Sequence, residues 1–404
     1  MSTSHTDIEL EDVEQWFEQE EETPEVVQPA VPVDPGQKYA DSQLRVVRET
    51  KDYQLDYLQH ALQPGRELID ISPAYQRRLR WSTKKKSLLI ESLLLNIPVP
   101  PIFLFERDYN EYEVIDGRQR LDAISSFLSN DYSLTGLEYW PELNRKRFLD
   151  LPSVLQRGLL RRSLPAVVLL AETKGTGDDG LDVRRVLFDR LNTGGIKLNP
   201  QELRNALYPG EFNSLLIRLA RSPLFATAWG IPPYVEGEEA EPSDELLRNA
   251  LFASLADAEL VLRFFALRDA ILHDKQGSLR TILDRFMASR SEVSEADLAE
   301  MEKQFMDCLG RLISIFGDAA FRLKGTKNKG TKRLSRPLYD AMMIALSRDP
   351  GIDIESHGAE IRAALNNALD DPDKYDVLVG RGNTIGAVHE RVELAASILR
   401  TGSE

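Results

Sequence analysis

A short apolar segment at residues 112–115 runs directly into Asp116-Gly117 and then into a helical pattern. Gly117 permits a sharp strand-to-helix turn that a residue with a Cβ would resist. The first helical turn holds two arginines and a glutamine: Arg118, Gln119 and Arg120. Arginines usually complement the C-terminal end of a helix, so two beside the N–H groups of a first turn indicate an anion. We therefore predict a phosphate site here, with an arginine-rich helix start as the structural alternative.

Strand and helix signals alternate around this turn. Strands are expected at residues 67–71, 102–105 and 166–170, and Ser82 is expected to cap a helix that ends at 96–97. Helical spacing dominates after residue 181. We therefore expect an α+β protein in three parts: an acidic disordered tail (1–42), an α/β nucleotide-binding domain (43–175) and an α-helical region (176–404).

Charge is distributed unevenly along the chain. Residues 1–37 contain eleven Asp or Glu and no Lys or Arg, and they account for most of the net charge of −15. Such a segment is expected to stay disordered and solvated. The alternative is a short acidic amphipathic helix that binds a partner through four apolar residues: Ile8, Val13, Trp16 and Phe17.

Several classes of protein are disfavoured. No apolar run approaches the length of a membrane span, and the N-terminus lacks a signal-like segment. The one cysteine, Cys308, indicates a reducing compartment, so we expect a cytoplasmic protein without membrane association. The five histidines are scattered, with no pair at zinc-ligand spacing and no His-rich nuclease motif.

A second polar motif spans residues 186–205. Its glycines suit a helix exit, and Asn199 with Pro200 suits the start of the next helix. Those structural roles leave a cluster of polar side chains unexplained: Arg190, Gln201, Glu202, Arg204 and Asn205. The cluster either braces the first motif or completes its nucleotide pocket.

Two basic stretches are candidates for DNA contact. The first places Gln76, Arg77, Arg78 and Arg80 beside Tyr75 and Trp81. The second, at 319–339, has seven Lys or Arg and no acid: Arg322, Lys324, Lys327, Lys329, Lys332, Arg333 and Arg336. If these stretches face DNA, the acidic tail competes for them, and deleting residues 1–37 should tighten DNA binding at low salt. A solvated basic loop and an inert tail are the alternatives.

Three segments together resemble a known family. They are Tyr-Gln-Arg-Arg…Trp-Ser (75–82), Leu-Ile-Glu-Ser-Leu-Leu-Leu-Asn-Ile-Pro-Val-Pro-Pro (89–101) and Val-Ile-Asp-Gly-Arg-Gln-Arg-Leu (114–121). They resemble the ParB/sulfiredoxin-like domain of GmrS-type restriction and defence proteins. The family's Asp-Gly-Gln-Gln-Arg appears here with Arg118 in place of one Gln, and residues 190–205 resemble its second signature. Sulfiredoxin chemistry needs a cysteine in this turn, and Cys308 lies far from it.

The resemblance implies a ParB-like domain that binds and hydrolyses a nucleoside triphosphate (GTP, UTP or CTP) with Mg²⁺. The chain would be a component of a prokaryotic anti-phage or modification-dependent restriction system, acting on DNA with a separate nuclease chain; self-association stays open. The expected catalytic residues are Asp116, which also holds the metal, Gln119 and Arg120. The expected nucleotide contacts are Gly117, Arg118, Gln76, Arg77, Arg78, Arg190, Asn192, Glu202 and Asn205. The expected DNA contacts are Arg80, Lys327, Lys329, Lys332, Arg333 and Arg336.

Two alternative functions remain at this point. One is a ParB-like DNA-binding adaptor that uses the nucleotide as a switch without hydrolysing it. The other is a ParB-type nuclease that acts alone. The same turn can serve binding, switching or hydrolysis, so the residues do not separate these functions.

Overall fold

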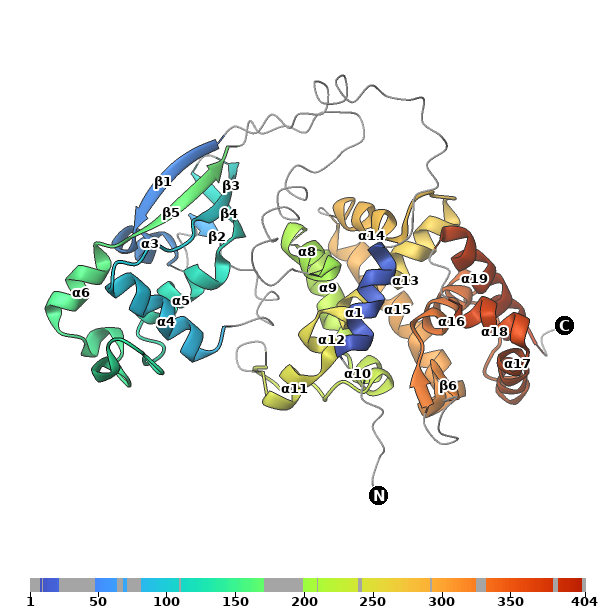
Figure 1. Cartoon of the computed structure of the whole chain (residues 1–404). Helices are drawn as coiled ribbons and strands as arrows, with labels where there is room; N and C mark the ends of the chain where they lie inside the picture. Colours follow the sequence, from blue (N-terminus) through green and yellow to red (C-terminus); the bar gives the residue numbers. More distant parts are fainter. Residues whose placement is uncertain are drawn as a thin grey trace. The chain divides into compact units, whose positions relative to one another are not determined.

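The computed structural model forms two compact units, one made of residues 30–198 and the other of residues 1–29 with 199–404. The residues it describes are 8, 10–21, 48–63, 68–70, 81–108, 110–170, 199–208, 210–238, 242–290, 293–324, 332–380 and 384–401. The predicted α+β class, with a mostly helical C-terminal region, is confirmed (Figure 1). The units divide between Leu198 and Asn199, whereas the sequence predicts a boundary at 175/176.

The first unit, the α/β unit, contains a mixed five-stranded sheet in the order β1-β5-β3-β4-β2. Its strands are β1 (Arg48–Gln54), β2 (Ile69–Asp70), β3 (Ile102–Asp108), β4 (Glu111–Asp116) and β5 (Ser163–Leu169). Strand β3 pairs antiparallel with β4 and parallel with β5, while β1 pairs antiparallel with β5. Its helices are α3 (Leu55–Ala61), α4 (Thr83–Leu94), α5 (Arg118–Leu128), α6 (Ser153–Leu160) and the 3₁₀ turns η2 (Pro141–Leu143) and η3 (Phe148–Asp150).

One face of this sheet is covered by its helices. Alternate residues of β5, namely Leu164, Ala166 and Val168, are fully buried, as the period of two in a strand requires. They share one core with Ile90 of α4 and Ile124 of α5. This packing places the N-terminal ends of α4 and α5 beside each other, because the two helices contact each other along the same core.

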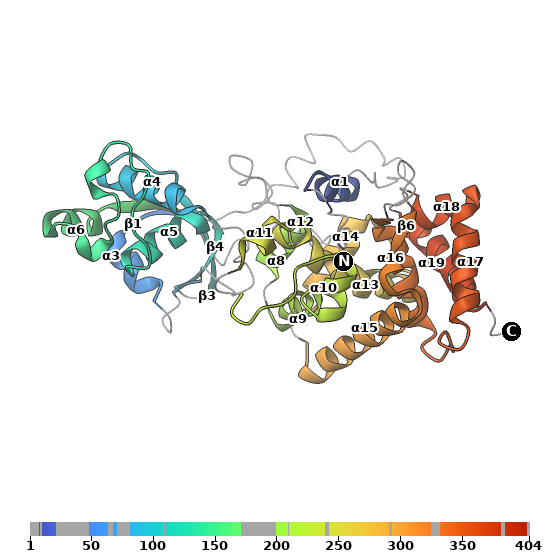
Figure 2. The same cartoon turned by 90° about the horizontal axis from the view of Figure 1, so that it is seen from below.

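The second unit is almost entirely helical (Figures 1 and 2). Its elements are α1 (Leu10–Glu21), α8 (Pro200–Leu207), α9 (Glu211–Ala220), α10 (Pro223–Trp229), α11 (Asp244–Arg248), α12 (Ala250–Ala253), α13 (Ala256–Leu272), α14 (Leu279–Ala288), α15 (Glu295–Phe316), η5 (Gly317–Ala319), β6 (Arg322–Lys324), β7 (Lys332–Leu334), α16 (Arg336–Arg348), α17 (Gly358–Asp370), α18 (Pro372–Val379) and α19 (Ile385–Leu399).

Helix α13 forms the centre of this helical unit. Residues 256–267 are all buried, which is typical of a helix surrounded by protein on every side. It packs against α9, α14, α16 and α19. Three of its buried residues are nevertheless charged, namely Asp257, Glu259 and Arg263, and each has a hydrogen bond or ion pair inside the core.

The structure differs from the predicted disordered tail at residues 10–21. These residues form α1, which packs against α12 and α14 of the helical unit. Val13 and Phe17 are buried, and the ring of Trp16 meets that of Trp229 edge-on at 6.3 Å. The amphipathic alternative thus describes this segment, with the helical unit of the same chain as its binding surface.

Candidate functional site

The turn between β4 and α5 has the geometry that the sequence predicts. Gly117 has a φ of 97°, in the left-handed region, and it caps α5. A Cβ at this position would lie 2.2 Å from Cγ2 of Ile102, so the turn requires glycine for two independent reasons. The hydrogen bonds of the helix begin with the N–H of Leu121, which donates to the carbonyl of Gly117 at 3.0 Å. The N–H groups of residues 118–120 therefore precede the first intrahelical bond.

Arg120 and Asp116 are joined across this turn. Nη2 of Arg120 donates to Oδ2 of Asp116 at 2.9 Å and to the carbonyl of Pro101 at 3.2 Å. The Arg120 side chain is 16% exposed and that of Asp116 is 33% exposed. Nε of Arg120 is buried without a hydrogen-bond partner among the described residues. The guanidinium is thus fixed at the turn by two hydrogen bonds from Nη2.

A second helix N-terminus lies next to this turn. Oε1 of Gln119 accepts a hydrogen bond from the N–H of Trp81 at 3.0 Å, immediately before α4. Ser82 caps α4 by accepting from the N–H of Lys85, as its sequence position predicts. Nζ of Lys86 lies 2.7 Å from Oδ2 of Asp122 in α5. These contacts hold the first turns of α4 and α5 together.

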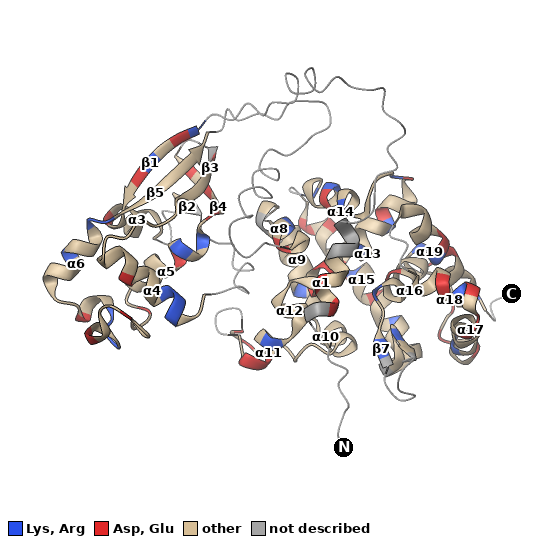
Figure 3. Cartoon of the chain, viewed as in Figure 1, with Lys and Arg blue, Asp and Glu red and all other residues tan. Residues whose placement is uncertain are grey.

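Positive charge collects at these two helix starts (Figure 3). Lys84 and Lys85 are exposed, and Nζ of Lys85 lies 4.7 Å from the ring centroid of Trp81. Cations at a helix N-terminus oppose the dipole, so such a concentration is stabilised by a bound anion. We did not predict the lysines, although their run after the cap residue Ser82 is the same signal as the arginines after Gly117.

Asp116 is the only acid of the turn itself, and it is the expected metal ligand. Among the described residues, no group of three or more His, Cys, Asp or Glu is arranged to hold a metal ion. A single carboxylate suits Mg²⁺ only where oxygen atoms of a ligand complete its coordination.

The described part of the second motif lies inside the helical unit. Asn199 caps α8 by accepting from the N–H groups of Gln201 and Glu202, and the Glu202 carboxylate accepts from the N–H of Asn199 at 2.8 Å. Burial raises the pKa of Glu202 to about 7, although the Asn199 hydrogen bond acts in the opposite direction. Asn205 accepts from Nδ2 of Asn213 at 2.8 Å. Arg190 and Asn192 lie outside the described residues.

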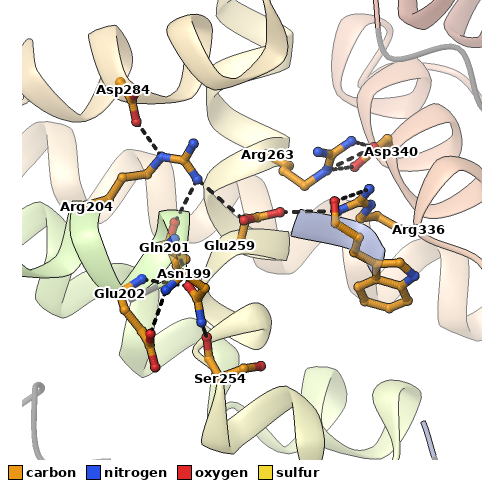
Figure 4. Close-up of polar contacts among 11 residues, drawn as sticks. Asn199, Gln201, Glu202, Arg204, Ser254, Glu259, Arg263, Asp284, Arg336 and Asp340 are labelled. Carbon is orange, nitrogen blue, oxygen red and sulfur yellow. Dashed lines mark hydrogen bonds and ion pairs between the residues drawn. The ribbon is translucent and has the colours of Figure 1, made fainter. Parts of the chain in front are cut away.

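Buried ion pairs connect α8 to the centre of the helical unit (Figure 4). Nε of Arg204 donates to Oδ1 of Asp284 at 2.7 Å, and its Nη1 lies 3.4 Å from Oε2 of Glu259. The other carboxylate oxygen of Glu259 lies 3.4 Å from Nη1 of Arg336. Arg263 pairs with Asp340 beside this chain of charges. The described residues of the motif therefore anchor α8 within the helical unit.

A comparison with known protein families identifies one family that part of the chain resembles. Residues 58–209 match the family described as GmrSD restriction endonuclease, N-terminal domain. This segment is similar to the GmrSD N-terminal domain. The match confirms the resemblance drawn from the three motifs and connects the chain to restriction and defence systems. No curated protein and no solved structure matches the chain.

The segment that matches the GmrSD family, residues 58–209, does not coincide with one compact unit. It contains the β4–α5 turn and continues through α8, which belongs to the helical unit. The buried pairs of Arg204 are thus the attachment of the last helix of the family segment to α13 and α14.

The remaining candidate residues are placed as follows. Gln76, Arg77, Arg78, Arg80, Lys327 and Lys329 lie outside the described residues, and Lys332 is described only by its backbone in β7. Arg333 is 70% exposed. The side chain of Arg336, a predicted DNA contact, is only 4% exposed, because it pairs with Glu259 and donates to the carbonyl of Trp16 in α1.

Across the described residues, no helix combines the length and the apolar character needed to span a membrane.

Proposed function

We propose that the chain is the nucleotide-hydrolysing component of a restriction or defence system. A nucleoside triphosphate would bind at the β4–α5 turn of the GmrSD N-terminal domain and be hydrolysed with Mg²⁺. The observation that carries this proposal is the junction of two cationic helix starts, linked by the hydrogen bond from Trp81 to Gln119. Two helix N-termini with their lysines and arginines offer the N–H groups and the charge that a polyphosphate needs.

Some residues at the two helix starts neutralise phosphate charge in this proposal, and others position the reacting groups. Arg118, Lys84 and Lys85 offset phosphate charge, while Nε of Arg120 supplies a fixed donor. Asp116 is the carboxylate for Mg²⁺, and Gln119 orients the attacking water. Catalysis of phosphoryl transfer consists mainly of positioning and charge neutralisation, so no covalent step by the protein is needed.

The preferred nucleotide is proposed to be GTP, UTP or CTP, and the effector a separate nuclease chain acting on DNA. The family description supports the restriction context. The scattered histidines of the sequence support a nuclease centre on another chain.

A second function is favoured by one observation. Gln119 and Arg120 are both engaged in hydrogen bonds within the protein. That is the arrangement expected of a turn that binds nucleotide as a conformational switch, in a DNA-binding adaptor, because a switch needs no group to position water.

A single set of measurements separates these functions. The purified chain is incubated with each of the four nucleoside triphosphates and Mg²⁺, and both binding and phosphate release are recorded. Arg120→Ala is expected to lower phosphate release by at least about a hundredfold, since fixed arginine donors contribute that much or more in related chemistry. Arg157→Ala, at an exposed arginine of α6, is the matched control and should leave release unchanged.

The outcomes are distinct. Binding without phosphate release by the unaltered chain would establish the switch. Undiminished release by a correctly folded Arg120→Ala variant would remove this turn from the mechanism.

A further inference from the structure

The strand pair β6–β7 concentrates positive charge on the helical unit. Its register pairs Lys324 with Lys332 and Leu323 with Arg333. Residues 319–339 contain seven Lys or Arg and no acid, so this stretch concentrates positive charge that an anion can offset. We call this the β6–β7 surface: the two strands together with Arg336 at the start of α16.

In this structure the anion belongs to the same chain. Helix α1 carries six acidic residues and no basic one. Oδ1 of Asp12 lies 3.6 Å from Nη2 of Arg333. Both Nη atoms of Arg336 donate to the carbonyl of Trp16 at 3.2 Å, and its guanidinium lies 5.3 Å from the Trp16 ring centroid. Helix α1 therefore contacts two of the three described arginines of the surface, Arg333 and Arg336, while Arg322 donates to the carbonyl of Ala228.

The docking of α1 depends mainly on apolar contact. The ion pair of Asp12 with Arg333 joins two exposed side chains, 40% and 70% accessible, and such pairs contribute little stability. Val13 and Phe17 are buried against the helical unit. A helix of 12 residues is marginal on its own in water, so α1 gains its order from this contact and loses it on release.

We infer that the β6–β7 surface binds the phosphate backbone of double-stranded DNA, and that α1 is a carboxylate-bearing cover which DNA must displace. Phosphate oxygens accept hydrogen bonds from guanidinium groups, as the Trp16 carbonyl does here, and carry the negative charge that the Asp12 carboxylate brings to Arg333. Displacement frees Arg333 from Asp12 and exposes Arg336 on the side now covered by Trp16. The choice of duplex DNA rests on the proposed restriction function, while the surface and its cover rest on the contacts alone.

The test compares the full chain with a variant in which α1 is undocked without a change in charge. Val13→Asn with Phe17→Asn removes the apolar contact and retains every acid. Binding of a fluorescent random-sequence duplex of about 30 base pairs is followed by anisotropy from 50 to 200 mM salt. The undocked variant is expected to bind about tenfold more tightly at the lowest salt, and its affinity should fall more steeply with salt because more phosphates are neutralised. Adding Arg333→Ala to it should remove most of the gain.

Matched controls separate docking from overall charge. Asp12→Asn and Glu14→Gln each remove one negative charge from α1, but only Asp12 pairs with Arg333. Asp12→Asn should therefore tighten binding more than Glu14→Gln. A peptide of residues 8–21, added to the undocked variant, should compete with DNA better than a scrambled peptide of the same composition.

Three results would overturn the inference: an undocked, folded variant that binds the duplex no better than the full chain, equal competition by the scrambled peptide, or equal affinity for duplex RNA. Phosphate release is measured on the same samples. If no phosphate is released while the DNA-binding results are as expected, the proposed nucleotide hydrolysis is wrong and the inference about the β6–β7 surface is retained.

Discussion

Nε of Arg204 donates to Oδ1 of Asp284 over 2.7 Å, joining two positions 80 residues apart in the buried core of the helical unit. The Arg204 side chain is 1% exposed and that of Asp284 is 11% exposed. Because Arg204 also approaches Glu259, its one charge faces two buried carboxylates. The pair therefore holds α8, the last helix of the segment that matches the GmrSD family, against α14 inside the helical unit.

Replacing this arginine should destabilise the helical unit strongly. Arg204→Ala leaves Asp284 with an uncompensated buried charge and Glu259 with Arg336 as its ion-pair partner, and breaking a buried pair costs about 3–5 kcal/mol of unfolding free energy. Arg218→Ala is the control, because Arg218 and Glu302 form an exposed pair, 57% and 42% accessible. That change should cost less than about 1 kcal/mol. Denaturant unfolding of the three proteins gives both values, and equal losses would contradict the role assigned to Arg204.

The β4–α5 turn should tolerate no side chain at its glycine. Gly117→Ala places a Cβ 2.2 Å from Ile102 and forces a positive φ on alanine. We expect a loss of about 2–4 kcal/mol of unfolding free energy, from backbone strain and overpacking together. Gly158→Ala is the matched change, since that helical glycine has open space around it. It should be neutral or slightly stabilising, by up to about 1 kcal/mol. A stable Gly117→Ala variant with full nucleotide binding would exclude the turn as the site.

How far the sequence predicts this structure depends on how local each signal is. The turn at Gly117 and the cap at Ser82 are set by neighbouring residues, and the structure has both. The sequence does not predict strand β1, because its residues, Arg48–Gln54, are mostly polar. Their extended conformation depends on pairing with β5, more than a hundred positions later in the chain.

The same limit applies to the candidate site and the basic surface. The burial of Arg336 depends on Glu259 from another helix and on the docking of α1, so its neighbours in sequence could not reveal it. The motif around Arg204 was visible as a polar cluster, but its partners on α13 and α14 lie far along the chain. A sequence pattern can single out a polar residue as a candidate for a structural or functional role. Only the partners that it meets from distant parts of the chain distinguish a binding role from an anchoring role.

The stability of the helical unit should fall as pH rises toward 8. Burial raises the pKa of Glu202 from its ordinary value of 4.5 to about 7 in the folded protein. Between these two values the folded state holds more protons than the unfolded state, so this group's contribution is complete below about pH 4.5 and is lost as pH rises through 7. Glu202→Gln, which imitates the neutral acid, should match the unaltered protein at pH 5 and exceed it at pH 8 by on the order of 2 kcal/mol. Thermal unfolding at both pH values measures this difference. Glu211→Gln, at an exposed acid in the first turn of α9, should show no such crossover; a crossover in both variants would assign the effect to overall charge.

The exposed lysines of α4 should contribute to nucleotide affinity. Lys84→Ala with Lys85→Ala removes two positive charges from the helix start that Gln119 ties to the β4–α5 turn. If a triphosphate lies across both helix starts, its dissociation constant should rise by about tenfold, with the larger effect at low salt, where exposed charges are least screened. The control, Lys146→Ala with Arg157→Ala, removes two exposed positive charges elsewhere in the α/β unit. Titration with a fluorescent nucleotide at 50 and 300 mM salt compares the two double variants. If both double variants weaken nucleotide binding equally, affinity depends only on the net charge of the α/β unit. The N-terminus of α4 would then not be part of the nucleotide site.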